Sequence, residues 1–215
     1  MHSKEKLLKR LKFYLILDAQ VNDYSELFEI VKIAAKTKVD ILQIRDKHGN
    51  AKDILDFSLK AMQHLKGRVP FIVNDRVDIA LASGASGVHV GTDDLPIKAA
   101  RKMLGSKAII GASCQSLEHA WKAQAEKADY IGFGSVFRTL TKPDRDEMDL
   151  GLLEQVVKTI KIPVFAIGGI SQDNVSTLLA LGVKRIAVCR AVCEAEDVGQ
   201  AMEDFQKILR STGKS

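Results

Sequence analysis

The sequence predicts a single eight-stranded (β/α)₈ barrel of the TIM type. Short apolar runs rich in β-branched residues alternate with segments of helical spacing eight times over the 215 residues. Several of these runs are continuously apolar, which is typical of parallel strands that are covered on both faces. We expect strands at residues 13–17, 40–44, 70–74, 87–90, 108–112, 130–134, 164–168 and 185–189.

The helices expected between these strands place apolar residues three and four positions apart. Their stripes comprise Leu27, Ile30, Val31 and Ala34, then Leu117, Ala120, Trp121 and Gln124, and finally Val198, Ala201, Phe205 and Ile208. We expect Trp121 and the methionines in the core. Serines are predicted as N-caps and glycines as helix ends, namely Ser25, Ser116, Ser171, Gly84, Gly105 and Gly182.

No linker rich in Pro, Gly or Ser interrupts the alternation, so we expect one domain over residues 1–215 with a core at about 13–210. A doubly wound open sheet is the alternative fold. Its dinucleotide-binding members carry G-x-G-x-x-G after the first strand, whereas this chain has LILDAQVND there. The barrel is therefore favoured.

Composition narrows the class of protein. The net charge of +5 is spread along the sequence, which suits an enzyme that attracts anionic metabolites. Neither a basic stripe nor a known module predicts a nucleic-acid partner. The three cysteines lack disulfide-framework and zinc-site spacing. The first apolar run stops at Asp18 after five residues, too short for a signal segment or a membrane span. We expect a cytoplasmic enzyme with no membrane partner.

Polar residues and one glycine follow the expected strands, at the end where the active sites of such barrels lie. They are Gln43, Arg45, Lys47, Asn74, Asp75, Asp94, Ser113, Thr139, Thr141, Lys142, Gly169 and Arg190. If the strands close into a barrel, these residues converge on one pocket.

The pocket is predicted to hold a metal and phosphate groups. Asp75 and Asp94 lie on neighbouring strand ends and can supply the one or two carboxylates that Mg²⁺ prefers beside phosphate oxygens. We interpret Asp93 as a turn residue. Arg45 and Lys47 suit a pyrophosphate group, and ion pairs with helix carboxylates are their alternative role.

A second phosphate site is expected from a loop and a glycine pair. The segment RTLTKPD, after the sixth strand, is long enough to close over a reacting centre. Gly168–Gly169 offers backbone N–H groups just before an expected helix N-terminus at SQDN. These elements favour a ligand with its own phosphate anchor.

Histidine shows no nucleophile-activating arrangement in the sequence. His89 alternates with Val88 and Val90, so it points to the opposite face of its strand, and we expect a hydrogen-bonded structural role for it. Catalysis is predicted to rest on positioning and charge.

Together these motifs resemble the thiamine-phosphate synthase (thiamine-phosphate pyrophosphorylase) family. The likeness covers roughly residues 13–205 in the family's order, with QIRDK, VNDRVDIALASGASGVHVGTDD, GASCQS, ADYIGFGSVFRTLTKPD, VFAIGGIS and AVCRAV. The resemblance implies a transferase of thiamine biosynthesis that condenses hydroxymethylpyrimidine diphosphate with thiazole phosphate. Thiamine phosphate and pyrophosphate are the implied products.

The resemblance also implies roles for individual residues. Mg²⁺ is the implied cofactor, held by Asp75 and Asp94. The pyrimidine diphosphate is assigned to Gln43, Arg45, Lys47, Asn74, Ser113 and Lys142, of which Arg45, Lys47, Ser113 and Lys142 are the implied catalytic residues. The thiazole phosphate is assigned to Thr139, Leu140, Thr141, Gly169, Cys189 and Arg190. Departures from the usual family residues occur at Thr92, Ser135, Arg138, Leu140 and Arg190, and they concern the lid and the thiazole-phosphate pocket.

Three alternatives stay open. A thiazole tautomerase on the same barrel resembles this chain, but it uses a histidine where Gln115 stands, with His119 one helical turn further on. A non-catalytic barrel that binds thiamine-pathway phosphates is the second. A phosphate-binding barrel of tryptophan or histidine biosynthesis is the third, and no fitting acid–base pair supports it. A homodimer and the use of Mn²⁺ are also open.

Overall fold

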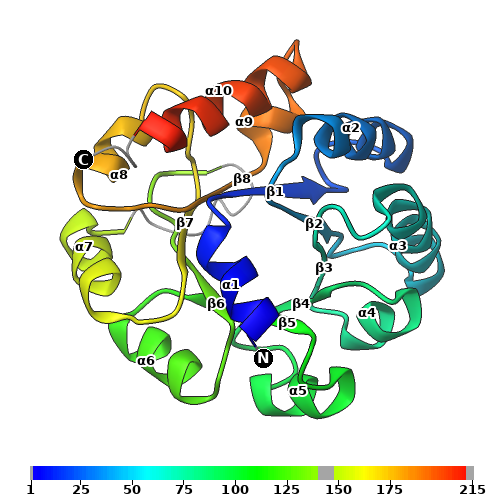
Figure 1. The fold of residues 1–215 in the computed structure, drawn as a ribbon, viewed down its shortest axis with the longest axis horizontal. Helices are drawn as coiled ribbons and strands as arrows, with labels where there is room; N and C mark the ends of the chain where they lie inside the picture. Colours follow the sequence, from blue (N-terminus) through cyan, green and yellow to red (C-terminus); the bar gives the residue numbers. More distant parts are fainter. Residues whose placement is uncertain (1, 140–147, 212–215) are drawn as a thin grey trace.

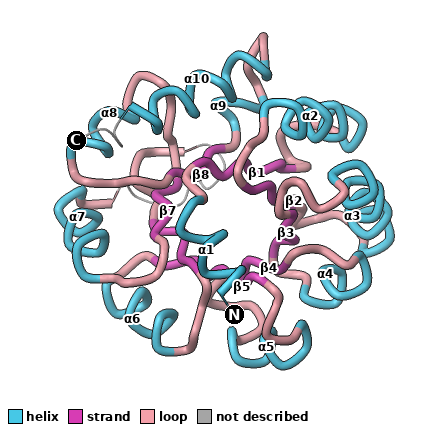
Figure 2. Tube along the Cα trace, in the orientation of Figure 1, coloured by secondary structure: helices cyan, strands magenta, loops and turns pink. Residues whose placement is uncertain are grey.

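The computed structural model describes residues 2–139 and 148–211, with the side chains of residues 2 and 3 left out. Eight parallel strands form a closed barrel in sequence order, and β8 pairs with β1 to complete it (Figures 1 and 2). This confirms the predicted fold class. The strands are β1 (Phe13–Asp18), β2 (Ile41–Arg45), β3 (Phe71–Asn74), β4 (Gly87–Val90), β5 (Ile109–Cys114), β6 (Tyr130–Phe133), β7 (Val164–Ile167) and β8 (Ile186–Val188).

Helices surround the barrel as an outer ring (Figure 2). They are α2 (Tyr24–Thr37), α3 (Ala51–Leu65), α4 (Val77–Ser83), α5 (Ile97–Leu104), α6 (Leu117–Ala125), α7 (Leu150–Thr159), α8 (Val175–Ala180), α9 (Arg190–Cys193) and α10 (Val198–Ser211). In the described ranges no helix is long and apolar enough to cross a membrane.

Strand alternation produces two separate cores, because successive side chains face the barrel axis and the helices in turn. The inner cluster contains large side chains such as Tyr14, Ile41, Ile72, Tyr130 and Phe165. The outer cluster lies between strands and helices and includes the buried stripe that was predicted for α2. The continuous apolar strand runs in the sequence thus report burial on both faces.

A further helix, α1 (His2–Arg10), lies across the barrel and was not predicted (Figure 1). Leu8 and Leu11 join the inner cluster, so this segment closes the end of the barrel at which the strands begin. The Lys4 ammonium lies 2.8 Å from the Asp129 carboxylate, just before β6, and donates to the carbonyl of Ala108, just before β5, at 3.1 Å. Arg101 of α5 holds the same Asp129 at 2.5 Å.

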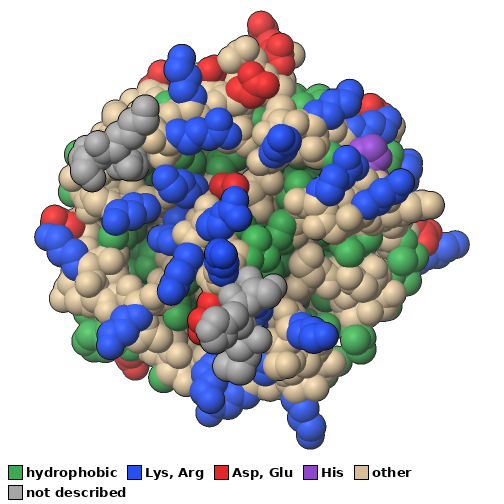
Figure 3. All heavy atoms as spheres, in the orientation of Figure 1, with side chains coloured by type: hydrophobic (Ala, Val, Ile, Leu, Met, Phe, Trp, Pro, Cys, Tyr) green, Lys and Arg blue, Asp and Glu red, His purple; other side chains and the backbone are tan. Residues whose placement is uncertain are grey.

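Basic side chains gather on the face that α1 covers (Figure 3). They line one groove there, and they are Lys4, Lys9, Lys98, Arg101, Lys107, Lys127, Lys158, Lys161, Lys184 and Arg185. Basic residues that are far apart in the sequence thus lie together around this groove.

Local details correct three predictions. The N-cap of α2 is Asp23 rather than Ser25, because Asp23 and Glu26 form a capping box. Asn174, not Ser171, precedes α8, whereas Ser116 caps α6 as expected. Trp121 and Met103, both expected in the core, are 53% and 46% exposed and lie outside it. The buried residues of α6 are Ala120 and Ala123, so the observed apolar face is rotated away from the stripe predicted with Trp121.

Candidate functional site

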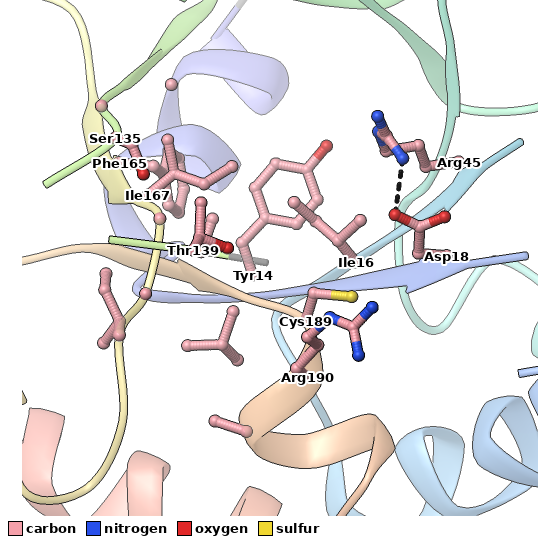
Figure 4. A pocket seen from close by; sticks show the side chains of 18 of the residues that line it. Tyr14, Ile16, Asp18, Arg45, Ser135, Thr139, Phe165, Ile167, Cys189 and Arg190 are labelled. Carbon is pink, nitrogen blue, oxygen red and sulfur yellow. Dashed lines mark hydrogen bonds and ion pairs between the residues drawn. The ribbon is translucent and has the colours of Figure 1, made fainter. Parts of the chain in front are cut away.

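The carboxyl ends of the strands surround a cavity of about 390 Å³ (Figure 4). The predicted site residues that line it are Gln43, Arg45, Asn74, Ser113, Thr139, Gly169, Cys189 and Arg190. They come together because each is either an inward-facing residue of a strand or follows the end of one. Leu140, Thr141 and Lys142 lie outside the described residues.

The two predicted metal ligands lie together beside this cavity. The Asp75 carboxylate pairs with the Lys47 ammonium and shares a hydrogen bond with Asp94, which also accepts the Gly91 N–H at 2.7 Å. Asp75 has φ +60°, a left-handed conformation that is uncommon away from glycine and concentrated at functional sites. His89 O accepts the Asp75 N–H at 2.8 Å and fixes this turn.

The electrostatics of this pair favour a cation. Burial and the hydrogen bond with Asp94 raise the pKa of Asp75, against the opposing effect of Lys47. Burial also acts to raise the pKa of Asp94, but hydrogen bonds from Asp75 and from the Gly91 N–H outweigh it and lower the pKa overall. Two carboxylates that share a hydrogen bond hold one proton between them, and a divalent ion can replace that proton.

The donor set fits Mg²⁺ better than a transition metal. Among the described residues no group of three or more His, Cys, Asp or Glu side chains is placed to hold a metal. Two carboxylates that leave room for phosphate oxygens and water are the usual protein contribution to a Mg²⁺ site.

Arg45 is fixed by a buried acid that the sequence analysis missed. Its Nη1 lies 2.6 Å from Oδ2 of Asp18, which is fully buried, and 3.2 Å from Oε1 of Gln20 (Figure 4). Asp18 ends β1 directly opposite Arg45 in the strand register. The predicted alternative of an ion pair for Arg45 is thus present, but with a strand residue, and it orients the guanidinium within the pocket. In the sequence, the signal for this ion pair is an acidic residue at the end of the first strand and a basic residue at the end of the second.

Asn74 offers a donor to the pocket. Its Nδ2 is buried, and within the described part of the chain it has no hydrogen-bond partner. Since an unpaired buried amide is costly, such a group in a pocket suits an acceptor-rich ligand such as a phosphate.

A hydrogen-bonded series of side chains, here called the floor network, crosses the barrel beneath the cavity. Gln43 Nε2 donates to the Tyr14 hydroxyl, which lies 2.8 Å from the Tyr130 hydroxyl. His89 Nδ1 lies 3.1 Å from the Tyr130 hydroxyl, and His89 Nε2 lies 3.0 Å from Oγ of Ser113. His89 was predicted to face away from Val88 and Val90 and to form hydrogen bonds, and both are observed. The tyrosines were not singled out, because an inward tyrosine in an apolar run looks like any core aromatic residue.

The wall of the pocket that follows β6 and β7 explains the double glycine. Gly168 and Gly169 have φ +107° and +61°. A Cβ on Gly168 would lie 2.0 Å from Oγ of Ser135, and one on Gly169 would lie 2.3 Å from the carbonyl oxygen of Arg138. The helix expected at SQDN is present as α8, whose N-cap is Asn174, the last residue of that motif, so the two glycines lie several residues before the helix N-terminus. The glycines allow the segment after β6 to approach β7.

Arg190 adds a cation to this wall. It lies beside Cys189 in Figure 4 and forms an ion pair with Glu194. Its Nε is buried and, as far as the described residues go, without a hydrogen-bond partner. The pocket therefore has two basic groups in its lining, Arg45 at the end of β2 and Arg190 after β8, with β1 between their strands.

Comparison with known proteins gives consistent matches. A family model described as thiamine monophosphate synthase matches residues 13–192. The thiamine-phosphate synthase of Methanobrevibacter smithii is 40% identical over 202 residues, 94% of this chain and 96% of that protein. That of Fusobacterium nucleatum is 38% identical, over 93% of this chain and 98% of its own length. Among solved structures, a thiamine phosphate pyrophosphorylase from Pyrococcus furiosus has TM-score 0.86 and 38% identity, covering 96% of this chain and 99% of that one.

Proposed function

The chain belongs to the thiamine monophosphate synthase family, and on this premise we propose how its pocket makes thiamine phosphate. The enzyme is a transferase that condenses hydroxymethylpyrimidine diphosphate with thiazole phosphate and releases pyrophosphate. The observation that supports this most is that one cavity is lined by two separate cations, Arg45 close to Asn74 at the ends of β2 and β3 and Arg190 after β8. Two phosphorylated rings need such separate anchors.

In this proposal the pyrimidine diphosphate occupies the side of β2 to β5. The Asn74 amide donates to a phosphate oxygen, and Arg45 and Lys47 neutralise the diphosphate charge. Because Asp18 already holds Arg45, little reorganisation is needed as charge develops on the leaving group. Ser113 and Gln43 contact the pyrimidine ring. Lys142, which lies outside the described residues, is also assigned to the diphosphate.

Asp75 and Asp94 would hold Mg²⁺, which when bound supplies positive charge to the leaving diphosphate. Lys47 already faces Asp75, so the same ammonium can turn to the diphosphate when its carboxylate partner binds a metal.

The thiazole phosphate occupies the opposite wall. Gly169, Cys189 and Arg190 surround its phosphate with Thr139, Leu140 and Thr141 from the loop after β6. The C–O bond between the pyrimidine methylene and the diphosphate breaks with its electron pair on oxygen, and the thiazole nitrogen then forms the new C–N bond. The chain's residues position the two rings and exclude water, and no protein nucleophile takes part.

The tautomerase alternative requires a base after β5. Gln115 stands at that position, and His119 is exposed on α6, where its backbone N–H donates to the cap residue Ser116. Neither supplies an imidazole to the pocket, so the synthase is favoured. We place the enzyme in the cytoplasm as one domain, with all three cysteines as free thiols.

The test is product formation by purified protein that is given both substrates, first with Mg²⁺ and then with EDTA. Metal-dependent appearance of thiamine phosphate together with pyrophosphate is the expected result. No product, with thiazole phosphate or thiamine phosphate still bound, would replace the proposal with a tautomerase or a non-catalytic binder.

A further inference from the structure

We propose that Asp46 and Tyr24 are positioning residues for Lys47, the ammonium that the proposed function assigns to the diphosphate. They hold the segment after β2, here called the β2 turn (residues 46–49), in the shape that directs Lys47 towards the strand-end pocket. This role rests on the proposed function, because it concerns how one group of that same site is held. Neither Asp46 nor Tyr24 lines the cavity, and neither needs to touch a substrate.

The Asp46 carboxylate is the centre of the β2 turn. Asp46 follows Arg45, the last residue of β2, and its Oδ1 accepts the backbone N–H groups of His48 at 2.9 Å and of Gly49 at 2.6 Å. An aspartate that accepts from the second and third residues after it closes a local turn by itself. Lys47 lies inside this turn, so its backbone is held from both sides.

Tyr24 binds the second oxygen of the same carboxylate. Its hydroxyl donates to Oδ2 of Asp46 at 2.7 Å. Tyr24 is the first residue of α2, and the centroid of its ring lies 5.2 Å from that of Phe57 in α3. The hydroxyl is therefore fixed by the two helices on either side of the β2 turn, and it ties the turn to both.

The charge and the packing of Asp46 agree with this arrangement. Burial acts to raise the pKa of Asp46, but hydrogen bonds from the Tyr24 hydroxyl and from the N–H groups of His48 and Gly49 outweigh it and lower the pKa overall. The carboxylate is thus ionised at neutral pH and accepts from all three donors. A Cβ on Gly49 would lie 2.0 Å from Oδ2 of Asp46, so glycine lets the carboxylate fold back against the turn.

The ion pair of Lys47 shows what the β2 turn achieves. Lys47 is exposed and its side chain is long and flexible, yet its ammonium pairs with Asp75, just after β3. With a flexible side chain, the position of the Cα atom decides which groups the ammonium can reach. In the proposed function the same ammonium turns from Asp75 to the diphosphate, and both lie within reach only while the turn keeps its shape.

Variants of Asp46 test whether the shape of the turn or its charge matters. Asp46→Ala should lower kcat/KM for the pyrimidine diphosphate by about tenfold, and should weaken the binding of pyrophosphate in the presence of Mg²⁺ by a similar factor. Asp46→Asn keeps an acceptor for the two N–H groups, and its amide can donate to the Tyr24 oxygen, so it should retain most of both. An asparagine variant as poor as the alanine variant would overturn the inference.

A double-mutant cycle with Lys47 separates positioning from a general effect on the fold. In a Lys47→Ala background, Asp46→Ala should cause no further loss, because the group that it positions is gone. An equal loss in both backgrounds would overturn the inference. Asn50→Ala is the matched control: it removes the side chain that accepts the Asp53 N–H at 3.0 Å at the start of α3, and should leave both readouts unchanged.

The two readouts also distinguish this role from the proposed function. A wild-type protein that forms no thiamine phosphate would contradict the proposed function, and the cycle measured by pyrophosphate binding would still decide the role of the β2 turn. A wild-type protein that does not bind pyrophosphate would overturn the role of the turn as well.

Discussion

Asp94 is the residue on which the proposed metal site most depends. Asp94→Ala should lower turnover by about two orders of magnitude or more, because one of two carboxylates for the cation is lost. Asp93→Ala, in the same turn but exposed, is the matched control and should retain activity. Steady-state rates over a Mg²⁺ titration measure both. Near-normal turnover of Asp94→Ala at ordinary Mg²⁺ concentrations would remove Asp94 from the site.

The ion pair of Asp18 and Arg45 has a structural and a functional side that mutation can separate. Asp18→Asn leaves a buried guanidinium without its counter-charge, so the free energy of unfolding should fall by about 3 kcal/mol. The double variant Asp18→Asn/Arg45→Met removes both charges and should recover part of that stability while staying inactive. Urea unfolding together with kcat/KM tests this. A double variant less stable than Asp18→Asn would contradict the account of the pair.

At the residue scale, the positions of polar residues relative to the apolar strand runs predicted which side chains reach the pocket. Gln43 and Arg45 were predicted at the end of the second strand, and both line the cavity. Asp18 and the tyrosines were missed because their partners come from other strands, and register between strands is not visible in a single run. The N-cap of α2 was predicted at Ser25, and the observed cap, Asp23, is set by its reciprocal contact with Glu26.

At the scale of elements, every strand was predicted to within two residues at each end, because burial on both faces gives an unambiguous apolar run. The helix α1 was not predicted. Its sequence is HSKEKLLKR, in which just two leucines stand among charged residues. Its place comes from contacts with the inner cluster and with Asp129, and no local pattern reports those.

The role of α1 can be tested with two adjacent leucines. Leu8 is 5% exposed and packs into the inner cluster, whereas Leu7 is 37% exposed. Leu8→Ala should lower the free energy of unfolding by about 2–3 kcal/mol, and Leu7→Ala should change it by less than about 0.5 kcal/mol. Chemical denaturation measures both variants. Equal effects would show that α1 does not close the barrel end in solution.

At the scale of the whole molecule, the tyrosines link folding to alkaline pH. Burial raises the pKa of Tyr14 and Tyr130, and burial together with the nearby Asp46 raises that of Tyr24. These are all three tyrosines of the chain. A raised native pKa means that the folded state holds the proton more tightly, so this contribution to stability is complete below the unfolded value of about 10 and is lost as pH rises above it.

Tyrosinate should therefore appear in one step with unfolding above about pH 10, rather than by titration of the native protein. Absorbance at the tyrosinate band and circular dichroism, recorded on the same samples, should change together. Gradual ionisation of two or more tyrosines with the circular dichroism intact would contradict the burial of Tyr14 and Tyr130.

The position of α1 also matters while the chain is being made. This helix leaves the ribosome well before its partners, because Asp129, which pairs with Lys4, follows it by 125 residues and Ala108, whose carbonyl accepts from Lys4, follows it by 104. The first strand likewise has one neighbour, β2, soon after synthesis, and must wait for β8 to complete its other edge. During translation the earliest part of the barrel therefore exposes both an apolar helix face and an unpaired strand edge, so it is the segment on which a nascent-chain chaperone would act.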